Sequence, residues 1–132
     1  MTRSPLYALA LMSLPFAASA QQIDCTNPQT QIDMTQCADQ DYLAADARLN
    51  AAYGPAIDYM ASIDASLDPA EQGAEAALRD GQRAWMTFRD ATCAAEGYMV
   101  HGGSMEGMVV VQCNTRLTLA RAADLEAMQP MN

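Results

Sequence analysis

The sequence has no lysine and only one histidine, and both shortages restrict its chemistry. Sixteen acidic residues stand against seven arginines, for a formal net charge of −9. Such a chain repels phosphate backbones and anionic lipids, so we expect a cationic partner rather than nucleic acid or a membrane. One histidine cannot build a histidine cluster for zinc, and a Ser/His/Asp triad would depend on a histidine in a Gly-rich loop. We therefore expect no metal, no other cofactor and no catalytic activity.

Long apolar runs are also missing. The most apolar stretch, 6–18, is too short to span a bilayer and is interrupted by Pro15. It follows Arg3 and precedes small residues that end at Ala20, a pattern typical of a cleavable secretory signal. We predict a signal peptide over 1–20, cleaved after Ala20, and one periplasmic or secreted domain over 21–132. Cleavage would leave six basic and sixteen acidic residues, a formal charge of −10.

Cysteine is scarce but even in number, and all four cysteines follow the predicted cleavage point. Four cysteines in a small exported domain are typical of two disulfides. Their spacings of 12, 56 and 20 residues lack the close pairs of zinc sites. With the helices placed as described below, we predict that Cys25 pairs with Cys37 and Cys93 with Cys113. A disulfide between Cys37 and Cys93 is the alternative that the sequence also allows.

The first predicted helix covers about 31–66. It begins at Thr30 and Asp33, which have the spacing of a capping box. Apolar residues then recur at spacings of three, four or seven, which is the stripe of an amphipathic helix. A helix of this length would be about 54 Å long. Either the molecule is elongated or the helix breaks, and Gly54-Pro55 is the expected kink.

Two further helices complete an all-α, three-helix antiparallel arrangement, a long helical hairpin plus a C-terminal helix. Asp68-Pro69-Ala70-Glu71 predicts the start of the second helix, which should end near Gly97. A Gly-rich loop leads to Ser104, the expected N-cap of the third helix. The run 108–111 is also compatible with a buried strand, but nothing else in the chain offers that strand a partner.

The segment 82–93 is dense in large side chains. On a helix, Trp85 and Phe88 share one side and should dock on the first helix. Arg83 and Arg89 should cover the edge of that contact or pair with acids such as Asp46 or Asp124, and Asp90 lies nearly in line with Arg83. The sharper alternative is a protein-binding anchor of exposed tryptophan and arginine.

Several blocks of the sequence resemble the LprI-type lysozyme inhibitor family of bacterial secreted proteins. Together they cover nearly all of the predicted mature chain. The blocks are T-Q-x-D-M-x-x-C-A from Thr30, A-D-x-x-L-N-x-x-Y from Ala45, Q-R-A-W-x-x-F-R-D-x-x-C from Gln82, G-G-S-x-x-x-M from Gly102 and C-x-x-x-L-T-x-x-R-A-x-x-L from Cys113.

The resemblance implies an all-helical envelope domain that binds and inhibits lysozyme. Two features depart from similar sequences: Gly54-Pro55 falls where they usually continue a helix, and Cys25 lacks a lipobox, so we expect no lipid anchor. Many lysozymes are cationic, so an anionic inhibitor would gain association rate from complementary fields. We expect the partner-binding surface to be the loop before the third helix, with His101, Gly102, Gly103 and Ser104.

Two other functions are weighed against inhibition. One is a structural or stress-related envelope protein that binds another protein or peptidoglycan fragments. The other is a glycan-modifying hydrolase that uses surface carboxylates.

Overall fold

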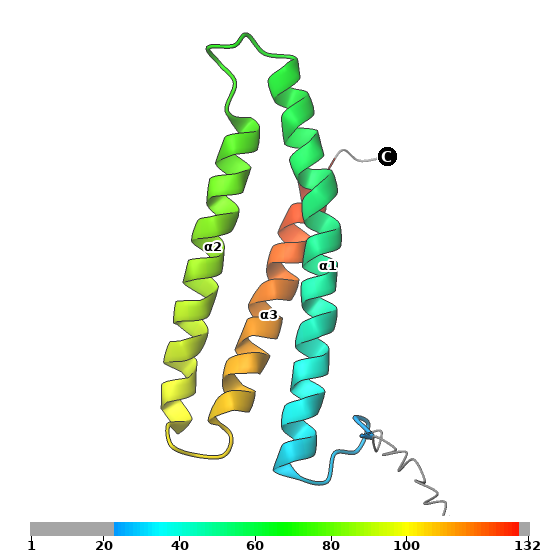
Figure 1. Cartoon of the computed structure of the whole chain (residues 1–132), viewed down its shortest axis with the longest axis vertical. Helices are drawn as coiled ribbons and strands as arrows, with labels where there is room; N and C mark the ends of the chain where they lie inside the picture. Colours follow the sequence, from blue (N-terminus) through cyan, green and yellow to red (C-terminus); the bar gives the residue numbers. More distant parts are fainter. Residues whose placement is uncertain (1–22, 130–132) are drawn as a thin grey trace, which may run out of the picture.

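The computed structural model describes residues 23–129, and it folds as three α-helices (Figure 1). α1 spans Gln31–Ala65, α2 spans Ala74–Gly97 and α3 spans Glu106–Ala127, with a short 3-10 turn, η1, at Tyr98–Val100. α1 and α2 form a long antiparallel hairpin, and α3 runs back antiparallel to α2 (Figure 1). The described residues contain no strand, and 108–111 lies within α3. The predicted fold class is confirmed, while the predicted signal peptide, 1–20, lies outside the described residues.

The first helix begins where the sequence predicts. Thr30 Oγ1 accepts a hydrogen bond from Asp33 N at 3.1 Å, and the Asp33 carboxylate accepts one from Thr30 N at 3.0 Å. The helix then continues through Gly54-Pro55, so of the two alternatives left open by the sequence the helix does not break there. Pro55 and Ala51, whose carbonyl loses its helical donor, both lie on the exposed side, where water can satisfy that carbonyl. The molecule is therefore elongated (Figure 1).

The second helix begins five residues later than the sequence predicts. Asp68-Pro69-Ala70-Glu71 forms turns, and Gly73 precedes the first helical residue. The cap comes instead from Asp64 in the last turn of α1. Its carboxylate accepts hydrogen bonds from the backbone N–H groups of Gly73 at 2.9 Å, Ala74 at 2.9 Å and Glu75 at 3.0 Å. These three hydrogen bonds lower the pKa of Asp64, and the bond from Gly73 has the largest effect.

The core is built largely from small side chains, which let the three helices approach closely. Its central cluster contains Leu49, Ala52 and Ala56 from α1, Leu78 from α2, and Ala122 and Leu125 from α3. Trp85 packs against this cluster and is partly buried, so its predicted role in the core is confirmed. Phe88 does not share that contact, because 58% of it is exposed.

Both predicted disulfides are present. Cys25 is bonded to Cys37 across 5.5 Å between α-carbons, and this bond fastens the N-terminal segment to α1. Cys93 is bonded to Cys113 across 5.4 Å and joins α2 to α3. None of the helices within 23–129 is both long and apolar enough to span a membrane.

Candidate functional site

The predicted partner-binding loop is tightly held by a residue that follows it. Glu106, in the first turn of α3, accepts a hydrogen bond from Gly102 N at 2.8 Å, and its other carboxylate oxygen lies 2.9 Å from His101 Nδ1. Gly103 N donates to the carbonyl of Val100 at 3.0 Å. Gly102 has φ +77°, a left-handed conformation that glycine adopts without strain. The loop is thus a preformed turn, and Glu106 is the positioning residue that the sequence analysis missed.

The chemistry of this turn follows from its contacts. Two contacts lower the pKa of Glu106: the contact with His101 has the larger effect, and the hydrogen bond from Gly102 the smaller. Glu106 therefore stays ionised at neutral pH and keeps the turn closed. The His101 ring also stacks on Tyr98, with ring centroids 4.9 Å apart. His101 is thus already engaged within its own chain, although its side chain remains 63% exposed.

Large apolar side chains are exposed beside the turn. Tyr98 is 70% exposed and Met99 78%, and Met105 is also exposed. Tyr98 and Met99 both lie in the loop 97–104 that is expected to bind the partner, but the sequence marks only the residues 101–104 of that loop as contacts. Their only signal was their position between a helix end and two glycines. An exposed aromatic and an exposed methionine on a rigid turn are typical of a protein-binding surface.

Ser104 has a different role from the one predicted. It is not the N-cap of α3, because Met105 precedes the first helical residue and no side chain caps this end. Ser104 instead lines a hollow of about 390 Å³ together with four residues from the start of α1: Gln31, Ile32, Thr35 and Gln36. The loop before α3 therefore lies beside the N-terminal end of α1.

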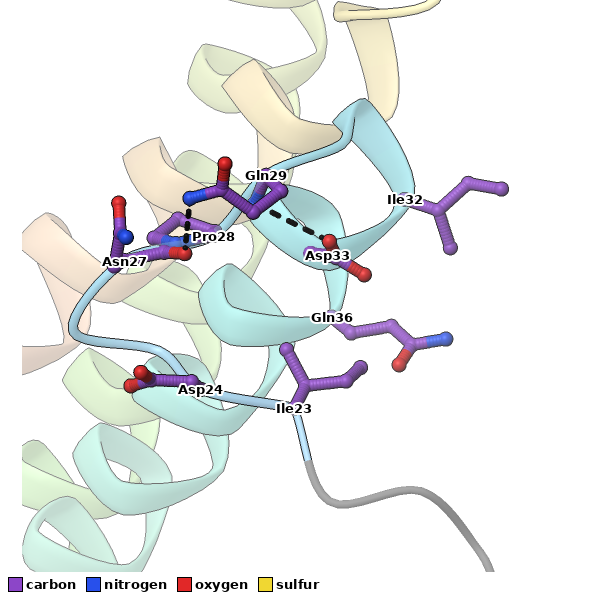
Figure 2. A pocket seen from close by; sticks show the side chains of 8 residues that line it. All are labelled: Ile23, Asp24, Asn27, Pro28, Gln29, Ile32, Asp33 and Gln36. Carbon is purple, nitrogen blue, oxygen red and sulfur yellow. Dashed lines mark hydrogen bonds between the residues drawn. The ribbon is translucent and has the colours of Figure 1, made fainter.

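A second hollow, of about 440 Å³, adjoins the first (Figure 2). Figure 2 shows the segment 23–29 crossing the first turns of α1. Gln29 donates hydrogen bonds to the Asp33 carboxylate and to the backbone carbonyl of Asn27. The two hollows share Ile32, 69% exposed, and Gln36. We call the loop 97–105, the segment 23–29 and the first turns of α1 the end face. The residues that line the second hollow are Ile23, Asp24, Asn27, Pro28, Gln29, Ile32, Asp33 and Gln36.

The dense segment of α2 is mainly structural. Arg89 lies over the rings of Tyr42 and Trp85, 5.8 and 5.2 Å from their centroids, and donates to Thr118 at 3.3 Å. It pairs with its neighbour Asp90 at 2.8 Å. Of the two roles expected for these arginines, Arg89 covers the edge of the aromatic contact. Neither Arg83 nor Arg89 pairs with Asp46 or Asp124, because each pairs with an acid nearer in sequence, Asp80 or Asp90.

Arginines along the helices pair with carboxylates of the same helix or of a neighbouring helix. Five arginines pair with five carboxylates, and His101 faces Glu106. The other ten of the sixteen carboxylates form no ion pair within the described residues. Residues 23–129 contain no group of three or more His, Cys, Asp or Glu side chains placed to hold a metal ion. The five arginine pairs are Arg48–Glu126, Arg79–Glu75, Arg83–Asp80, Arg89–Asp90 and Arg116–Glu96.

Comparison with known proteins places the chain in a family. The family model described as "Lysozyme inhibitor LprI" matches residues 24–125. An uncharacterized protein of Rhizobium meliloti (strain 1021) is 41% identical over 130 residues, which cover 94% of each chain. No solved structure matches the chain. The match to the family model extends over most of the described helices, and the chain therefore belongs to the LprI lysozyme inhibitor family.

Proposed function

We propose that the protein is exported and that it binds and inhibits lysozyme by non-covalent, partly electrostatic association. The family match over 24–125 is the observation that carries this proposal. The family description names inhibitors and not enzymes, and we assign no catalytic step to this chain. Two disulfides support export, because such bonds persist in oxidising compartments. Secreted material should begin at Gln21.

Charge supports a cationic partner. Ten carboxylates form no ion pair with a residue in 23–129, and they leave a net negative surface along the elongated bundle. Because many lysozymes are cationic, opposite fields would accelerate encounter and favour correct orientation. Salt screens such fields over about 8–10 Å at physiological ionic strength. The association should therefore weaken as salt rises.

The proposed contact surface is the turn before α3, which contains His101, Gly102, Gly103 and Ser104. Lysozyme hydrolyses glycans between two carboxyl groups in a cleft, so an inhibitor must enter or cover that cleft. Tyr98 and Met99 supply exposed contact area on this turn. Because Glu106 already fixes the turn, little conformational entropy is lost on binding.

One assay tests the function. The mature oxidised protein is titrated into lysozyme that is lysing bacterial cell walls, at low and at high salt. We expect stoichiometric inhibition that decreases at high salt. No inhibition at either salt concentration would refute the function and leave a structural or stress-related envelope role. Glycan turnover by the protein alone would instead indicate a hydrolase.

Two matched variants test the surface. Tyr98→Ala removes a 70% exposed aromatic from the turn, and Phe88→Ala removes a 58% exposed aromatic from the side of α2. We expect Tyr98→Ala, combined with His101→Ala, to raise the inhibitory concentration about tenfold or more, as for a central contact residue. Phe88→Ala should leave it unchanged. Equal inhibition by all variants would place the inhibitory surface elsewhere while leaving the function intact.

A further inference from the structure

Another hollow surface, separate from the two of the end face, lies at the opposite end of the bundle. α3 stops before the arms of the hairpin do, and α1 and α2 extend beyond its last turn (Figure 1). A groove of about 400 Å³ opens there. We call it the Arg121 groove. Its lining residues are Met60 from α1, Ala74, Ala77, Leu78 and Gly81 from α2, and Arg121 and Met128 near the end of α3.

The lining combines apolar side chains with a single charged group. Apart from Arg121, every residue that lines the groove is alanine, glycine, leucine or methionine. Arg121 Nε donates to the side-chain oxygen of buried Gln82 at 2.9 Å, which fixes the direction of the guanidinium. The groove therefore presents a held cation at the edge of an apolar surface.

Arg121 also differs from the other arginines of the described residues. Each of the other five pairs with a carboxylate of this chain, whereas Arg121 pairs with none of the carboxylates within 23–129. A half-buried guanidinium is stabilised when it donates bidentate hydrogen bonds to a carboxylate. The chain has sixteen acids, yet none within 23–129 pairs with Arg121. This lack of a carboxylate partner indicates that the Arg121 guanidinium binds an anion from another molecule.

We propose that the Arg121 groove binds a linear aliphatic carboxylate. The head group accepts hydrogen bonds from the free guanidinium N–H groups of Arg121, and the chain lies along Leu78 and the two methionines. A groove of about 400 Å³ falls within the range of small-molecule sites, about 300–1,000 Å³. A peptide fits less well, because its backbone amides would find no side-chain partner in the lining other than Arg121.

Decanoate is a direct probe of this assignment. The protein is labelled with ¹³C at the methionine methyl groups and titrated with decanoate at neutral pH. The signals of Met60 and Met128 should shift together and saturate, while Met99 and Met105 at the end face report any unspecific binding. Because the protein is anionic, added salt should tighten binding of decanoate, the reverse of the effect expected for lysozyme.

Two pairs of variants separate charge from shape. Arg121→Gln should weaken decanoate binding about tenfold or more, and Arg83→Gln, which removes an exposed arginine paired with Asp80, should not. Gly81→Leu should abolish binding by filling the groove. A Cβ at Gly81 meets nothing within 4 Å, so this substitution tests occupancy even if Arg121→Gln disturbs the fold. Gly107→Leu, at an equally open glycine near the start of α3, is its control.

Three results would overturn the proposal. The first is no shift of Met60 and Met128 at millimolar decanoate. The second is undiminished binding by both Arg121→Gln and Gly81→Leu. The third is equal affinity for 1-decanol, since a neutral head group of the same chain length should bind about tenfold less tightly if the guanidinium recognises the carboxylate. Saturable binding that depends on Arg121, on Gly81 and on the carboxylate supports it.

Discussion

The substitution Gly97→Ala should destabilise the protein, although alanine is the better helix former. Gly97 is buried at the end of α2 and has ordinary helical angles, φ −57° and ψ −35°. A Cβ at this position would lie 2.6 Å from Cγ2 of Val110 in α3. Ordinary contacts begin near 3.4 Å, so one of the two helices or the valine must move.

The neighbourhood resists that movement. Valine is β-branched and strongly prefers one rotamer in a helix, so Val110 cannot easily turn its methyl group away. The Cys93–Cys113 disulfide joins the same two helices one turn from each residue and keeps them from separating. Overpacking of this kind costs about 1–3 kcal/mol. The higher helix propensity of alanine offsets about 0.5–1 kcal/mol of this cost in the free energy of unfolding. Taken at the middle of both ranges, the net loss should be about 1 kcal/mol in the free energy of unfolding.

Urea unfolding followed by circular dichroism measures this loss. Gly81→Ala is the matched control, because a Cβ there meets nothing within 4 Å and only the propensity gain remains, about 0.5–1 kcal/mol of stabilisation. Val110→Ala in the Gly97→Ala background should restore part of the loss and give a positive coupling in a double-mutant cycle. If Gly97→Ala were as stable as the parent protein, the close approach of α2 and α3 at this point would be wrong.

Three further predictions concern the rest of the bundle. Trp85→Ala should cost about 3 kcal/mol, near the lower end for tryptophan because the side chain is partly exposed, and a urea midpoint equal to the parent's would contradict its place in the core. Replacing Cys93 and Cys113 together with alanine opens a loop of 20 residues and should lower the free energy of unfolding by about 3 kcal/mol, also measured in urea. Asp64 has a lowered pKa in the folded protein, so its contribution is complete above its ordinary value of 3.8 and is lost as the pH falls through the lowered value. The protection of the Ala77 amide against exchange, relative to its intrinsic rate at each pH, should therefore decrease in acid and in Asp64→Asn at neutral pH, and unchanged protection in that variant would refute the cap.

Local chemistry explains the parts of the fold that the sequence predicts correctly. The capping box at Thr30 is formed by residues three apart, so it is visible in the sequence. The disulfide Cys93–Cys113 follows from a short connection between two helices, which makes them antiparallel neighbours. The stripe of apolar residues in α1 also has a strictly local period.

The errors arise where a distant residue decides the outcome. Asp68-Pro69 has the local pattern of a helix start, but Asp64 supplies its carboxylate to a start five residues further on. Phe88 is in phase with Trp85 on a broad stripe, yet none of the three described helices covers its side chain, which is 58% exposed. Helical periodicity gives the angle of a side chain around its own helix, but it does not give the position of the neighbouring helices.

The candidate site shows the same limit. The sequence indicates a Gly-rich loop with one histidine, which is enough to locate a turn between two helices. It does not reveal that Glu106 holds His101, or that Ser104 lies beside Ile32 from the start of α1. The first contact depends on the path of the loop between His101 and Glu106. The second depends on how α1 and α3 are placed side by side, and the first hollow of the end face results from that placement.

The distribution of charge then separates the two ends of the molecule. Five arginines are held by carboxylates of the same chain, so they stabilise the bundle locally and are not available to an anionic partner. The remaining carboxylates give the protein a long-range attraction for cations, and the end face adds exposed apolar contact area to it. Among the arginines of residues 23–129, Arg121 is the exception. It lies in an apolar groove at the other end, where its short-range contact with an anion can outweigh the long-range repulsion of that anion once salt screens the repulsion. A cationic protein and a small aliphatic anion would thus respond to salt in opposite directions on the same molecule, because they use different ends and different ranges of the same electrostatic field.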